Sequence, residues 1–154
     1  MSRILCMVQQ GQTDRSRFRA IEHALVGAYR HALDSADRPL VVWMEVPAGQ
    51  GFTESRPSSM SWLMAEVDDG LDAARRERVL LAMSEAWSTA TGTRSDQLML
   101  AVCDSSSFVR YQRLNAARVR PIARPLFLVR TAARLAWSRV RHGYLSLPVN
   151  YRTS

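Results

Sequence analysis

The sequence repeats itself, and this feature constrains the fold more than any other. Residues 2–45 align with residues 61–104 at a constant offset of 59 and without a gap. The hydropathy recurs as well: an apolar run, a glycine turn, an amphipathic stretch and a second apolar run follow in the same order in both copies. The repeat therefore predicts two copies of one β-α-β unit, fused into one domain. Six aligned pairs are identical: Ser2/Ser61, Val8/Val67, Gly11/Gly70, Arg17/Arg76, Arg19/Arg78 and Asp37/Asp96.

Each copy carries the signals of a strand, a helix and a second strand. In the first copy, residues 4–8 and 40–44 are apolar runs, and residues 18–32 place apolar side chains at helical spacing. Two strands joined by a helix of this length should be parallel, with a right-handed crossover. We therefore expect an α/β domain of the α+β two-layer sandwich type, with a four-stranded sheet and two helices on one face. The corresponding segments of the second copy are residues 62–67, 72–89 and 98–103.

The remaining residues divide into a linker and an extension. Residues 46–60 are rich in Gly, Pro, Ser and Thr, which predicts a linker between the two copies. We place the repeat-containing domain at residues 1–112 and a C-terminal helical extension at residues 113–154. Near this boundary the pattern predicts a turn at 104–107 and helices at 108–120 and 126–141.

The charge is unevenly distributed along the chain. All 21 basic residues are arginines. Residues 1–109 hold 11 arginines against 14 acidic residues, whereas residues 110–154 hold 10 arginines and no acidic residue. The body is thus mildly acidic and the C-terminal segment strongly basic.

Composition excludes several classes of protein. An apolar content of 47% and a charged content of 23% in 154 residues are typical of one globular domain with a real core. No apolar run approaches the roughly 20 residues of a membrane span, and we expect no signal peptide because the first apolar run is short and soon followed by polar residues. We expect a cytoplasmic protein in which Cys6 and Cys103 are buried, reduced thiols, with a disulfide as the alternative.

The tandem unit, the strand that begins at the second residue, and residues 42–49, Val-Trp-Met-Glu-Val-Pro-Ala-Gly, resemble the tautomerase superfamily. The cis-3-chloroacrylic acid dehalogenase group is the nearest likeness, and malonate semialdehyde decarboxylase is a more distant one. The resemblance covers about residues 2–113. It implies a homotrimer that acts without a cofactor on small enolisable or halogenated carboxylic acids.

The resemblance also implies an amino-terminal proline as general base or acid, with arginines that hold the substrate carboxylate. This chain departs from that pattern at every matched position. Ser2 stands where the proline is expected, and Tyr29 stands where a water-activating histidine is expected. The other departures are residues 68–71 in place of arginines, Ala101 in place of a tyrosine and Arg110 in place of an acidic residue.

Ser2 has three interpretations. Removal of Met1 would leave a primary amine with an ordinary pKa of roughly 7.7–8, which can act as a general base. The Ser2 hydroxyl can act as a nucleophile activated by that amine, or Ser2 can merely begin a strand. Tyr29 can donate a hydrogen bond to a substrate carbonyl or simply pack. Arg110 and Arg113 can hold a substrate carboxylate, remain solvated or pair with Asp68 and Asp69.

No metal site is expected, because His23, His31 and His142 lack the spacing of metal ligands. The arginine-rich extension could lie across a trimer, meet phosphates or rest on an anionic membrane. No known nucleic-acid-binding module is recognisable, so nucleic acid is not the expected partner. The sequence leaves two hypotheses: a tautomerase-like or hydratase-like protein without the catalytic proline, and a non-catalytic trimeric relative whose extension serves assembly or binds an anionic partner.

Overall fold

The computed structural model describes residues 2–148 of the 154-residue chain. Turns and helix caps coincide with the residues that favour them. Gly92 and Gly143 end two of the helices in the left-handed conformation, and Asp72 caps a helix N-terminus through its side chain. The strands are β1 (Arg3–Gln9), β2 (Leu40–Val46), β3 (Phe52–Thr53), β4 (Arg56–Pro57), β5 (Ser61–Val67), β6 (Leu98–Asp104) and β7 (Leu145–Pro148). The helices are α1 (Phe18–Leu33), α2 (Ala73–Thr91), α3 (Ser105–Ala117) and α4 (Arg124–His142).

Five strands form one sheet in the order β6-β5-β1-β2-β7. Within each copy of the repeat the two strands are parallel, β1 with β2 and β5 with β6, as the β-α-β pattern predicts. The copies meet where β1 pairs antiparallel with β5. The first residues of β1 therefore lie beside the last residues of β5. Strands β3 and β4 form a separate two-stranded hairpin within the predicted linker.

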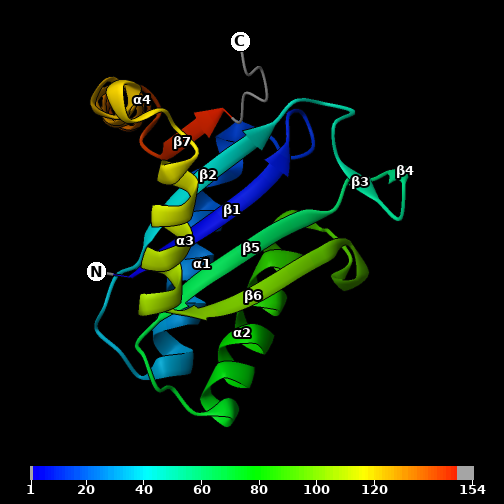
Figure 1. Cartoon of the computed structure of the whole chain (residues 1–154). Coiled ribbons are helices and arrows are strands. Elements are labelled where there is room, and N and C mark those ends of the chain that lie inside the picture. The colour runs from blue at the N-terminus through cyan, green and yellow to red at the C-terminus, as the bar shows by residue number, and fades with distance from the viewer. Residues whose placement is uncertain (1, 149–154) are drawn as a thin grey trace.

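Helices α1 and α2 cover one face of the sheet, and α3 crosses part of the opposite face (Figure 1). This arrangement confirms the two-layer α/β body with two helices on one face. Helix α4 lies beside the edge of the sheet, next to β7 (Figure 1). A single apolar core lies between the sheet and the two helices. The largest fully buried side chains in it include Phe18, Trp43 and Trp87, and the Phe18 and Trp43 rings stack with centroids 3.8 Å apart.

Burial shows how the two copies correspond. The core-facing strand residues Ile4, Cys6 and Val8 match Leu63, Ala65 and Val67 at the offset of 59. The core-facing helix residues correspond at an offset of 58 instead. Ile21, Leu25 and Tyr29 on α1 match Val79, Met83 and Trp87 on α2. The gapless alignment is therefore right for the strands and one residue out for the helices.

The shift arises in the turn that follows the first strand of each copy. Gly11 and Gly70 both adopt a positive φ, near 80°, and they correspond at a sequence offset of 59. The side chains of Asp14 and Asp72 then both cap the start of a helix, and these two residues match at 58. The second copy has one residue fewer between glycine and cap. The identical pairs Arg17/Arg76 and Arg19/Arg78 are consequently not structurally equivalent.

The C-terminal part of the chain differs from the sequence expectations in two ways. The predicted turn at residues 104–107 is wrong: β6 continues to Asp104, and α3 begins at Ser105 with the extended backbone of Asp104 as its N-cap. The second difference is β7, which pairs parallel with β2 and adds a fifth strand to the expected four. The boundary that we placed between residues 112 and 113 falls inside α3; the division into domains stays an expectation.

Candidate functional site at the start of β1

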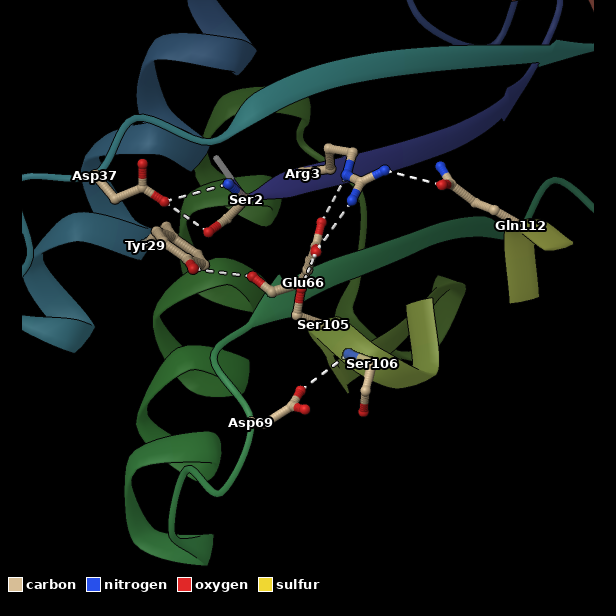
Figure 2. Close-up of polar contacts among 9 residues, drawn as sticks. All are labelled: Ser2, Arg3, Tyr29, Asp37, Glu66, Asp69, Ser105, Ser106 and Gln112. Atoms are coloured by element: carbon tan, nitrogen blue, oxygen red, sulfur yellow. Dashed lines mark hydrogen bonds and ion pairs between the residues drawn. The ribbon is translucent and has the colours of Figure 1, made fainter. Parts of the chain in front are cut away.

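The polar groups of the expected site gather where β1 begins and β5 ends, beside the first turn of α3 (Figure 2). Ser2 is half-buried there. Its hydroxyl donates a hydrogen bond to the Asp37 carboxylate over 2.6 Å, and its backbone nitrogen lies 3.3 Å from the same oxygen. These hydrogen bonds hold the pKa of Asp37 below its ordinary range. Both polar groups of Ser2 therefore face one negative charge.

Tyr29 reaches this end of the sheet from α1, but its side chain belongs to the core. The residue is 2% exposed, and its hydroxyl donates a hydrogen bond of 2.9 Å to the main-chain carbonyl of Glu66. Burial raises the pKa of the Tyr29 hydroxyl, while hydrogen bonding with the Ser2 side chain opposes the shift. Tyr29 is thus both a packing residue and a neighbour of Ser2.

Glu66, at the end of β5, is the centre of the hydrogen-bond network. It is 2% exposed, although it is an acid in a strand next to the start of the chain. Arg3 donates to both of its oxygens, with Nε 2.7 Å from one and Nη2 3.2 Å from the other. The hydroxyl of Ser105 donates to Glu66 over 2.6 Å. A buried carboxylate of this kind is stable only with such partners.

Helix α3 covers the network. The backbone nitrogen of Ser106 donates to the Asp69 carboxylate over 2.9 Å, which holds the pKa of Asp69 below its ordinary range. The Arg3 guanidinium lies 4.6 Å from the ring centroid of Phe108, which is buried. The Gln112 side chain accepts a further hydrogen bond of 3.0 Å from Arg3 (Figure 2). Arg3 therefore links the sheet to α3.

Arg110 and Arg113 lie on α3, and the side chains of both are exposed. Neither forms an ion pair within residues 2–148, so neither pairs with Asp68 or Asp69. The structure thus brings Ser2 and Tyr29 together and leaves the two arginines on the surface of the neighbouring helix.

Sequence reasoning missed Arg3, Asp37, Glu66 and Ser105. One signal was available: Asp37 and Ser2 are both among the identical repeat pairs. For Glu66 the available signal was a single acid within the apolar run of residues 62–67, which does not show what the carboxylate contacts. Its role depends on the antiparallel pairing of β1 with β5, which brings residues 3 and 66 together.

The cysteines and the hollow beside α1 do not contribute to the network around Ser2 and Glu66. Cys6 and Cys103 are free thiols, and burial raises the pKa of each. Within the described part of the chain, no three His, Cys, Asp or Glu side chains are grouped so that they could hold a metal ion. A hollow of about 410 Å³ lies beside α1 and the start of β2, with His23, Arg30 and Arg38 in its lining.

The fold of the body has relatives among solved structures. A symmetric trimer of fused 4-OT has a TM-score of 0.61 and 16% identity, covering 66% of this chain and 83% of that one. A member of the cis-3-chloroacrylic acid dehalogenase family has a TM-score of 0.61 and 17% identity, covering 66% and 73%. A malonate semialdehyde decarboxylase inhibited by 3-bromopropiolate has a TM-score of 0.51 and 20% identity, covering 67% and 82%.

The chain has the tautomerase fold. At these identities the likeness concerns the fold alone. No family model matches the chain, and no curated protein matches it at a significant level. The tautomerase-fold structures cover two thirds of the chain. The remaining third is about as long as the C-terminal segment that begins with α3 at Ser105.

Proposed function

We propose that the start of β1 is a weak or altered proton-transfer site of the tautomerase or hydratase type, for small carbonyl or unsaturated carboxylic acids. In this proposal Met1 is removed and the Ser2 nitrogen becomes a primary amine that serves as the base. The observation that carries the proposal is the contact between that nitrogen and Asp37, at 3.3 Å. The fold shared with fused 4-OT and with a dehalogenase-family protein supports the class of chemistry.

The Asp37 contact also gives a physical reason for weak activity. A carboxylate next to an ammonium group favours the charged form, so Asp37 would raise the pKa of the amine above its ordinary value of roughly 7.7–8. Little unprotonated amine would then be present at neutral pH. Activity that depends on the free amine should rise as the pH increases through this raised pKa.

Tyr29 and the α3 arginines complete the proposed site. The Tyr29 hydroxyl would donate to a substrate carbonyl, for which it must give up its hydrogen bond to the Glu66 main chain. Arg110 and Arg113 would hold the substrate carboxylate from the surface of α3, and both are unpaired within residues 2–148. No cofactor takes part in this proposal.

We also propose that the protein is a homotrimer. Solved trimers of fused 4-OT share its fold. Strand β6 lies at the edge of the sheet with no strand on its outer side among the described residues, and Met99 on this strand is 52% exposed. An open strand edge with an exposed apolar side chain favours burial against another copy.

A second candidate is a non-catalytic protein with the same fold. The observation that favours it is the closed hydrogen-bond network, in which Ser2, Tyr29 and Arg3 all have partners within the chain. A pocket that binds substrate would normally present unpaired polar groups. In this case the network has a purely structural role, and it holds α3 against the sheet.

Three measurements distinguish the candidates. Mass spectrometry of the intact protein shows whether Met1 is removed; retained Met1 would eliminate the amine as a base. Turnover of phenylpyruvate enol or a haloacrylate that rises with pH and is abolished by blocking the amine supports the first candidate. The variant Asp37→Asn should lower the amine pKa and move the pH profile toward neutral. No turnover in wild type, Asp37→Asn or Ser2→Pro would support the non-catalytic protein.

A further inference from the structure

Helix α4 carries an apolar face that points away from the body of the protein. Leu126, Val129, Trp137 and Val140 are between 62% and 84% exposed, and the alanines at 132, 133 and 136 between them are exposed as well. At 100° per residue these side chains share one broad side of the helix. An amphipathic helix of a globular protein normally turns this side toward the core. Here it faces solvent.

The opposite side of α4 fixes this orientation. Ser138 is buried, its hydroxyl donates to the Tyr144 carbonyl over 3.0 Å, and the Ser146 nitrogen donates to the same hydroxyl over 3.1 Å. Ser146 in turn donates to the buried Glu45 on β2 over 2.7 Å. These contacts hold the side of α4 that carries Ser138 against β7 and the edge of the sheet. The apolar side cannot rotate inward without breaking them.

Arginines border the apolar face on both sides. Arg130, Arg134 and Arg141 lie along one border, and Arg139 lies along the other. The Arg141 guanidinium is 6.0 Å from the ring centroid of Trp137. Within residues 2–148, none of the arginines from Arg110 onward forms an ion pair. The face is thus an apolar strip bordered by arginines that form no ion pair within the described residues.

Charge distinguishes three possible partners for the apolar face of α4: a second copy of the chain, a nucleic acid and a lipid surface. A second copy could cover the apolar strip, but its body, residues 1–109, holds only three more acidic residues than arginines (14 against 11), whereas residues 110–154 of each chain hold ten arginines and no acidic residue. A nucleic acid would neutralise them but would leave the apolar strip in water. A surface that combines hydrocarbon with phosphate charge satisfies both requirements at once.

We infer that α4 docks on an anionic lipid bilayer, lying in the plane of the interface. Leu126, Val129 and Val140 would enter the boundary between headgroups and acyl chains, with Trp137 at headgroup level. The bordering arginines would extend to the lipid phosphates. No helix of the described chain is long and apolar enough to cross a membrane, so the protein would lie on the bilayer. The inference is independent of any chemistry at Ser2.

The test is flotation of the full-length protein with two kinds of vesicle. One contains equal parts of phosphatidylglycerol and phosphatidylcholine, and the other contains phosphatidylcholine alone. The wild type should float with the anionic vesicles only, and added salt should release it. The double variant Arg130→Gln/Arg134→Gln should bind more weakly, by roughly fivefold for each arginine removed.

A second double variant, Val129→Glu/Val140→Glu, should abolish flotation. Its matched control is Leu81→Glu, because Leu81 is a 63% exposed apolar residue on α2, away from α4. The control should float as the wild type does. Circular dichroism shows that each variant is folded.

Three results would overturn the inference. The first is a wild type that does not float with anionic vesicles at low salt. The second is a Val129→Glu/Val140→Glu protein that still floats, since binding by charge alone would not need the apolar strip. The third is a change in this variant from oligomer to monomer by light scattering, which would identify a second copy as the partner that covers the apolar strip.

Discussion

The two copies of the repeat share a backbone but not their polar chemistry. In the first copy, Ser2 is half-buried and bonds to Asp37. In the second, the matching Ser61 is fully buried and accepts a hydrogen bond from Gln12, while the matching Asp96 pairs with Arg94 on the surface. The same two residue types therefore form a network in one copy and separate contacts in the other. Duplication preserved the strands, and the surroundings of each copy decided what its side chains do.

The copies also differ in how deeply their second strands are buried. Strand β2 lies between β1 and β7, whereas β6 is an edge strand. Trp43 on β2 is fully buried, and the residue that matches it on β6, Val102, is only partly buried. The C-terminal extension thus strengthens the first copy and leaves the second open at its edge.

The largest effect is expected from this difference in burial. Trp43→Ala should lower the free energy of unfolding by about 3–5 kcal/mol, because it removes a stacked ring and leaves a cavity. Val102→Ala at the matching position should cost only about 1 kcal/mol, since fewer buried contacts are lost. Urea unfolding followed by fluorescence or circular dichroism measures both. A loss for Trp43→Ala no larger than that for Val102→Ala would contradict the deeper burial of β2.

The next effect concerns the ion pairs of the two copies. Glu66→Gln should lower the free energy of unfolding by roughly 2–3 kcal/mol, because it leaves the partly buried Arg3 without a counter-charge. The control is Asp96→Asn, which removes an exposed pair with Arg94 and should change stability by less than about 0.5 kcal/mol. Thermal unfolding of the three proteins at one pH tests this order. A small loss for Glu66→Gln would contradict the role of Glu66 as the centre of the network.

Tyr29→Phe should have a smaller effect, a loss of about 1 kcal/mol, because the Glu66 carbonyl would lose its donor while the ring still packs. Tyr144→Phe is the matched control, since Tyr144 is also buried and its ring contacts Phe18. We expect the control to stay within about 0.5 kcal/mol of wild type. If both variants lost the same amount, the Tyr29 hydroxyl would have no special role.

The smallest effect is expected from Asp37. Its pKa is lowered in the folded protein, chiefly by the Ser2 hydroxyl, so its contribution to stability is present at neutral pH. That contribution should be lost as the pH falls below 3.8, the ordinary value, and through the lower folded-state pKa. Asp37→Asn should therefore reduce stability slightly at pH 7 and converge with wild type in acid. Chemical unfolding at several pH values measures the difference.

Local pattern was enough to predict most of the body, for reasons that can be stated residue by residue. The apolar run of residues 4–8 predicts a buried strand, and the helical spacing of Phe18, Ile21 and Leu25 predicts a helix with one buried face. Such periods survive in any fold that buries that face. Pattern failed at the start of α3, where three consecutive serines indicated a turn. It also failed to show β7, because a four-residue strand carries too little periodicity.

The sequence by itself determined the repeat, the parallel pairs within each copy, and the basic extension without acidic residues. Tertiary structure alone decided that Glu66 meets Arg3, because two residues 63 positions apart become neighbours only when β5 pairs with β1. It also decided which side of α4 faces outward. A helix carries its apolar strip in its own sequence, but the direction of that strip is set by the contacts of the opposite side, here those of Ser138 with the segment of β7.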